Sequence, residues 1–189
     1  MNILSSQPPA SLTLTALSGI PLLNPGDNLV LIILQSLKQS NLSLENGDIL
    51  VIAQKVVSKA EGRYARLADI IPSERAFKLA EITGKDPRLV ELILSESREI
   101  VRHSKRTIQS SGVVVAENRQ GIVLANAGID SSNVGSESED EKVLLLPIDP
   151  DKSAGNINKE LQLKFKVRLA VIINDSLGRA WRNGTTGTA

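Results

Sequence analysis

The chain has 189 residues, of which 41% are hydrophobic, 23% charged and 2% aromatic, and its formal net charge is +1. These values are ordinary for a globular protein and allow one substantial domain. A net charge near zero gives no support for nucleic-acid binding, which needs a basic face, and the aromatic residues are too few for platforms on which bases stack.

The chain has no cysteine and a single histidine, His103. Disulfides, cysteine nucleophiles and thiolate zinc sites are therefore excluded, and a histidine zinc cluster needs more than one histidine. Any metal must be held by oxygen ligands, which favours Mg²⁺, Mn²⁺ or Ca²⁺.

The longest apolar run, Leu29 to Leu34, is far shorter than the roughly 20 residues that a membrane helix needs. The N-terminus carries Pro8-Pro9 and lacks the basic start of a signal peptide. We expect a cytoplasmic protein without a membrane or nucleic-acid partner.

Residues 1–17 are expected to form a tail followed by a short strand around Leu12, Leu14 and Leu17, and residues 18–189 the main domain. Asp27, after a Pro-Gly turn, can cap a helix over 28–38, whose apolar positions have helical spacing. The apolar run 49–53 predicts a buried strand.

Ser73 predicts the cap of a helix that ends near Gly84, and Asp86-Pro87 predicts the start of another that runs to about residue 96. Residues 113–116 and 122–126 predict a hairpin.

The rest of the chain alternates loops with regular elements. Residues 127–134 are predicted to form a loop, and the acidic stretch 136–142 a solvated excursion rather than a site. A strand at 143–146, a helix at 153–163 and a strand at 167–173 follow. Because hairpins intrude between alternating helices and strands, we expect an α/β fold of the mixed α+β kind, with a mixed sheet and flanking helices.

Two carboxylates are candidate metal ligands. Asp175 follows the apolar strand 167–173, and ligands of open α/β sheets collect beyond the carboxyl ends of strands. Asp130 lies in a loop of small polar residues that begins at another strand end, where Gly128 would allow a ligand to approach the backbone. The alternatives are an Asx turn at Asp175 and a loop that only satisfies its own backbone at Asp130.

Lys55 and Lys59 follow the strand 49–53 and can bind phosphate, although a solvated lysine is the more common case. Arg179 and Arg182 could hold an anionic substrate. The sequence has no P-loop, no nucleophile elbow and no dinucleotide-binding glycine motif, so any nucleotide is bound in an unusual way.

Other polar residues are interpreted as structural. Asp149 is expected to form a turn and helix cap, Glu61 an ordinary surface pair with Lys59, and Trp181 a packing contact. His103 has no partner in the sequence pattern that would make it catalytic.

A set of motifs spread from about residue 18 to the end of the chain resembles the coenzyme F420-0:L-glutamate ligase family, of which the chain would be the N-terminal part. The motifs lie at residues 19–22, 47–51, 54–63, 72–76, 84–87, 126–133, 144–151 and 175–182.

The resemblance implies an enzyme that binds GTP and two divalent ions, Mg²⁺ or Mn²⁺, with K⁺ as a further candidate. It would join L-glutamate to coenzyme F420-0 through an acyl phosphate and could add further γ-linked glutamates. It also implies a homodimer.

Carried over by motif, the resemblance implies roles for particular residues and leaves the catalytic residues unknown. Ser176 stands where the family usually has threonine. The implied metal ligands are Asp130, Asp175 and Ser176, and the implied GTP contacts are Ile20, Pro21, Leu22, Leu23, Gln54, Lys55, Lys59 and Asn133.

The family's pattern continues beyond the motif at Gly187, so the domain 18–189 is expected to be incomplete at its C-terminus. Two other hypotheses stay open. The chain could be an amide ligase of the same fold that acts on another acidic metabolite, or a GTP-binding remnant without catalysis.

Overall fold

The computed structural model describes residues 11–108, 110–130, 141–178 and 183–188. They form an α/β arrangement of the mixed kind, with three separate sheets instead of the one expected from the sequence. The strand expected at Leu12–Leu17 does not form, and residues 11–23 hold neither helix nor strand. Leu12 and Leu14 alternate with polar residues, but both are more than 80% exposed and do not pack against the rest of the protein as a buried strand face would.

One sheet has the order β1-β7-β8, in which β1 (Ile49–Ala53) pairs with β7 (Ala170–Gly178) in parallel. β8 (Thr185–Thr188) pairs with the far half of β7 in the antiparallel direction. The strand expected at 167–173 therefore begins later and continues through Asp175, because β8 supplies a second partner where β1 ends.

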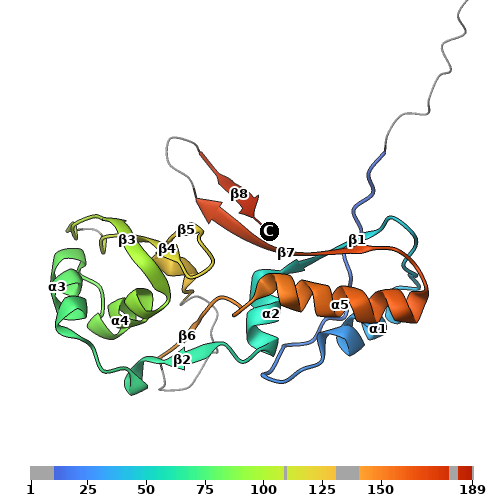
Figure 1. Cartoon of the computed structure of the whole chain (residues 1–189), viewed down its shortest axis with the longest axis horizontal. Helices are drawn as coiled ribbons and strands as arrows, with labels where there is room; N and C mark the ends of the chain where they lie inside the picture. Colours follow the sequence, from blue (N-terminus) through green and yellow to red (C-terminus); the bar gives the residue numbers. More distant parts are fainter. Residues whose placement is uncertain (1–10, 109, 131–140, 179–182, 189) are drawn as a thin grey trace, which may run out of the picture.

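Helices α1 (Leu29–Gln39), α2 (Gln54–Ala60) and α5 (Pro150–Phe165) lie along this sheet (Figure 1). Residues of α1, α2 and α5 share one hydrophobic cluster with Ile52 and Ile173 from the sheet. Each aliphatic side chain buried here contributes about 1.5–3 kcal/mol. α1 is capped by Asn28, whose side chain accepts from the Leu31 N–H, and not by the expected Asp27, which accepts from Asn24 instead.

A second cluster lies at the other end of the molecule, where α3 (Glu74–Thr83) and α4 (Pro87–Ser95) pack with the sheet β3-β4-β5 (Figure 1). The strands are β3 (Ser97–His103), β4 (Val114–Asn118) and β5 (Val123–Ala125). The capped helices and the β4–β5 hairpin confirm the sequence predictions. His103 is the last residue of β3 and is exposed.

The short ladder of β2 (Tyr64–Arg66) and β6 (Lys142–Leu144) runs between the two clusters (Figure 1). Two 3-10 turns, η1 (Leu67–Asp69) and η2 (Asn126–Gly128), complete the described part. No helix among the described residues combines the length and apolar character needed to cross a bilayer.

Candidate functional site

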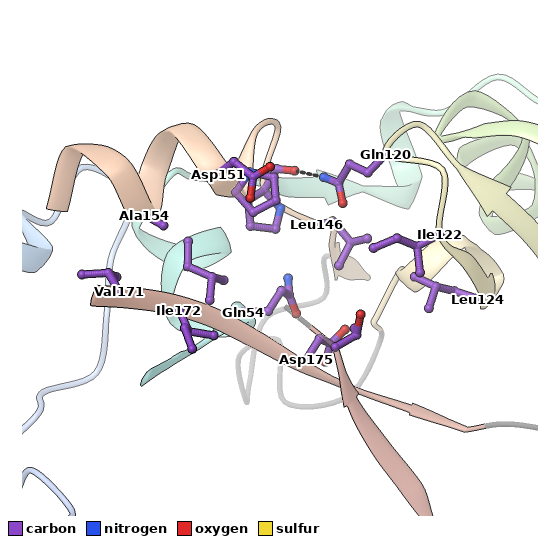
Figure 2. A pocket seen from close by; sticks show the side chains of 14 residues that line it. Gln54, Gln120, Ile122, Leu124, Leu146, Asp151, Ala154, Val171, Ile172 and Asp175 are labelled. Carbon is purple, nitrogen blue, oxygen red and sulfur yellow. Dashed lines mark hydrogen bonds between the residues drawn. The ribbon is translucent and has the colours of Figure 1, made fainter. Parts of the chain in front are cut away.

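The site is built around the junction where β1 ends and α2 begins. Ala53 is the last residue of β1 and pairs with Asn174 of β7. Gln54 and Asp175 are therefore the first residues beyond the parallel ladder in their two chain segments and lie side by side. Figure 2 shows their side chains next to each other. Gln54 is buried and its amide donates to the Ser58 hydroxyl at 2.5 Å. The parallel ladder therefore ends here, at the carboxyl end of β1.

Asp175 differs from the expectation in one respect, because it lies within β7 and not beyond it. Its carboxylate accepts a hydrogen bond from the Ser176 backbone N–H at 2.8 Å, and Ser176 itself is exposed. Asp175 lies where β7 changes its pairing partner from β1 to β8. Its carboxylate oxygens therefore remain available at the surface of the sheet.

Lys55 forms an ion pair with Asp130. Asp130 is held in place by two backbone hydrogen bonds with Leu144, at 3.0 and 2.8 Å. Lys55 is the second residue of α2 and directly follows Gln54, so it lies near the end of β1 as expected. Asp130 and Asp175 are therefore both placed at the start of α2, although they are distant in sequence.

The candidate GTP contacts extend from this point along α2. Lys59 lies one turn after Lys55 and so shares its helix face. The segment with Ile20 to Leu23 leads to Gly26, whose N–H donates to the Ala60 carbonyl at the end of α2. Leu22 is 90% exposed. A seven-residue helix is about 10 Å long, a length that a nucleoside triphosphate can span.

A left-handed turn precedes Asp130. Asn126, Ala127 and Gly128 have φ values of 52°, 54° and 78°. A left-handed conformation costs roughly 1–2 kcal/mol for a residue with a side chain, and such strain is concentrated at functional sites. The Asn126 amide oxygen is buried without a hydrogen-bond partner among the described residues. The sequence signal for this turn was limited to the asparagine and the glycine, which tolerate positive φ.

Gly128 has a different role from the one expected. A Cβ at this position would lie 2.6 Å from Leu146 Cδ1 and 3.0 Å from Leu124 Cδ1. The close approach that glycine permits here is to these two leucine side chains, and not to a ligand.

A pocket opens beside the site, between β7 and the start of α5 on one side and the β4–β5 hairpin on the other (Figure 2). It has a volume of about 140 Å³, and Gln54 and Asp175 belong to its lining. Two further polar residues lie at its rim (Figure 2). Gln120 was not singled out in the sequence, and Asp151 was interpreted only as part of the turn and helix cap at 149–151.

Other motif residues hold the elements together. Glu61 accepts from the Ser153 hydroxyl at 2.5 Å and does not form the expected pair with Lys59. Arg63 donates to the Leu146 carbonyl at 2.8 Å and pairs with Glu96 at 3.1 Å. Asp149 caps α5, as predicted.

Several predicted residues cannot be placed, because they lie outside the described residues. Of the acidic stretch 136–142 only Glu141, which pairs with Arg88, and Lys142 are described. The residues outside are Asn133 among the GTP candidates, together with Arg179, Trp181 and Arg182.

Asp130 and Asp175 offer oxygen donors of the kind that hard divalent ions prefer. Among the described residues no group of three acidic or histidine side chains gathers at one point. Mg²⁺ is commonly bound by one or two carboxylates together with substrate phosphates. The ammonium of Lys55 at the Asp130 carboxylate shows that this carboxylate already faces a positive charge.

The fold and the site define an α/β protein with two carboxylates and two lysines placed around one short helix. Residues 19–189 match the sequence profile of the family F420-0:Gamma-glutamyl ligase. The chain belongs to this family, and the resemblance found in its motifs is confirmed.

Three relatives are each named coenzyme F420:L-glutamate ligase. That of Methanothermobacter thermautotrophicus is 45% identical over 178 residues, which cover 94% of this chain and 67% of the relative. That of Methanocaldococcus jannaschii is 42% identical, over 77% of this chain and 54% of the relative. That of Methanopyrus kandleri is 44% identical, over 87% of this chain and 60% of the relative. The chain thus spans between about half and two thirds of their length.

Proposed function

We propose that this chain ligates L-glutamate to coenzyme F420-0 and uses GTP and two divalent ions, Mg²⁺ or Mn²⁺, to do so. The observation that supports the proposal most is the meeting of Asp130, Asp175, Lys55 and Gln54 at the start of α2, in a chain of this family. A homodimer in the cytoplasm, with K⁺ as a further candidate ion, remains an expectation.

The proposed reaction has two steps. The carboxylate of F420-0 attacks the γ-phosphorus of GTP, which gives an acyl phosphate and GDP. The amine of glutamate then attacks the acyl carbon, inorganic phosphate leaves, and the amine loses a proton to solvent. An amide bond is formed and GTP is consumed.

The residues of the chain supply binding and charge. Asp130, Asp175 and the Ser176 hydroxyl would hold the divalent ions, which neutralise the charge that builds up on the phosphate oxygens. If the Asp130 carboxylate held a divalent ion, the Lys55 ammonium that now pairs with it would bind phosphate oxygens instead. Lys59, one turn away, binds the nucleotide further along α2.

The proposal is tested with Asp175→Asn, which keeps the shape of the side chain and removes its charge. We expect metal-dependent GTP consumption to fall by about 10²-fold or more, because a charge that stabilises the transferring phosphate is lost. Circular dichroism should show the fold unchanged.

Asp69→Asn is the matched control, since Asp69 pairs with Arg66 on an exposed surface away from the site. Unchanged GTP consumption in Asp175→Asn would remove Asp175 from the site. A chain that binds GTP but never consumes it, with every substrate present, would favour the non-catalytic remnant.

A further inference from the structure

The pocket beside Asp175 has two apolar walls. Ile122, Leu124 and Leu146 form one wall, and Ala154 with residues 171–173 of β7 forms the other. Figure 2 shows the two walls facing each other across the pocket. Two apolar surfaces in this arrangement suit a flat aromatic ring.

The size of the pocket matches one ring. Its volume is about 140 Å³, and an apolar cavity of about 150 Å³ in another protein accepts benzene. The polar residues of the lining are Gln120 and Asp151 at the rim, and Gln54, Asp175 and Thr188 at the side of the candidate metal site. Figure 2 shows Gln120 and Asp151 on one side of the pocket, with Gln54 and Asp175 on the other. An aromatic ligand with polar groups at its edge would be held in one orientation.

The position of the pocket indicates that its ligand is not GTP. Of the candidate GTP contacts that the structure describes, Gln54 alone lines the pocket. Lys55 and Lys59 lie further along α2, and residues 20–23 lead to Gly26, whose N–H bonds the end of α2. A phosphate at Asp175 would therefore have the nucleotide on one side and the pocket on the other. The group that attacks the phosphorus must approach from a side that the nucleotide does not occupy.

We propose that this pocket, defined by Ile122, Leu124, Leu146, Ala154 and residues 171–173, binds an aromatic ring of coenzyme F420-0, a deazaflavin and the acceptor in the proposed function. The proposal rests on the proposed function and deepens it. Asp175 itself belongs to the lining, so a ring in the pocket lies beside the candidate metal site. A flexible arm between ring and carboxylate then allows the carboxylate to reach a phosphate at Asp175.

The test fills the pocket with a side chain. Ala154→Leu adds three carbon atoms at the pocket wall, whereas Gly155→Leu adds a side chain at the next position of α5, where a Cβ meets nothing within 4 Å. The fluorescence of F420-0 is titrated with each variant, and GTP affinity is measured in parallel. We expect Ala154→Leu to weaken F420-0 binding about tenfold or more while GTP affinity stays unchanged, and Gly155→Leu to change neither.

Ile122→Phe fills the pocket from the opposite wall and should give the same result, which covers the case in which Ala154→Leu fails to fold. If the unaltered chain binds F420-0 and both filling variants bind it equally well, the pocket assignment is wrong and the proposed function stands. If the unaltered chain neither binds F420-0 nor forms a glutamyl product, the proposed function itself fails, and the assignment fails with it.

Discussion

Gly128 and Gly155 show how one residue type serves two purposes. Gly128 has a φ of 78° and lies against Leu146 and Leu124, whereas Gly155 is exposed within the regular helix α5. A methyl group at Gly128 meets both backbone strain and the leucine side chains, while a methyl group at Gly155 meets open space.

We predict opposite effects of alanine at these positions. Gly128→Ala should lower the free energy of unfolding by about 2–4 kcal/mol, from left-handed strain of about 1–2 kcal/mol and the cost of overpacking. Gly155→Ala should raise it by about 0.5–1 kcal/mol, because glycine is disfavoured inside helices. Urea denaturation of both variants provides the measurement, and equal effects of the same sign would show that the turn is not strained as described.

The backbone conformation of the turn at residues 126–128 could be predicted only in part from the sequence. The asparagine and the glycine favour positive φ, but nothing local predicts it for Ala127, which is buried in the second cluster. Tertiary packing imposes this conformation. The convergence of Asp130 and Asp175 was predictable from their positions after apolar strands, whereas the ion pair of Asp130 with Lys55 depends on α2, which was not predicted.

At the scale of elements, the cap of α3 links stability to pH. The Ser73 hydroxyl accepts from the Ala76 N–H at 3.2 Å. Its hydroxyl and backbone N–H also donate to Glu91 of α4, and these hydrogen bonds lower the pKa of Glu91 below 4.5. A depressed carboxyl pKa adds stability that is fully present above the pKa of the unfolded chain and is lost as the pH falls through the pKa of the folded state.

We predict that Ser73→Ala destabilises the fold by about 1 kcal/mol near neutral pH, from loss of the cap. The unaltered chain should lose stability on acidification below about pH 4.5, and the variant should lose less over the same range, because the hydroxyl that lowers the Glu91 pKa is absent. Thermal unfolding across this range measures both effects. An identical pH dependence of the two proteins would contradict the role given to Ser73.

The elements that were predicted correctly are those with local signals. Ser73 and Asp86 mark helix starts by their side chains, and Gly84 ends α3 in the left-handed conformation. β6 confirms the strand predicted at 143–146. β2 and its pairing with β6 were missed, because β2 has only three residues and its partner is remote in sequence. The helix α2 was missed because its Val56-Val57 pair continues the β-branched character of β1.

At the scale of the whole molecule, Arg63 connects the two clusters. Its guanidinium bonds the Leu146 carbonyl on the chain between β6 and α5, and it pairs with Glu96 at the end of α4. Both partners of the pair are about four-fifths buried, with side-chain exposures of 20% and 18%. When one partner of such a buried pair is removed, the other remains as an uncompensated buried charge, which lowers the stability of the fold.

We predict that Arg63→Met lowers the free energy of unfolding by about 2–4 kcal/mol. Arg66→Met, in the same strand but in an exposed pair with Asp69, should cost less than about 1 kcal/mol. A double-mutant cycle of Arg63→Met with Glu96→Gln should show a coupling of about 1–2 kcal/mol. Equal costs for the two arginine variants would mean that Arg63 does not join the clusters.

The measurement that tests the central claim most directly is mass spectrometry of the reaction product. The chain is incubated with F420-0, L-glutamate, GTP and Mn²⁺, with Asp175→Asn as the comparison. The account predicts an F420-0 adduct heavier by one glutamyl residue, formed only with GTP and Mn²⁺ present and absent with Asp175→Asn. Folded chain that yields no adduct under these conditions, or an adduct that forms without GTP, would contradict it.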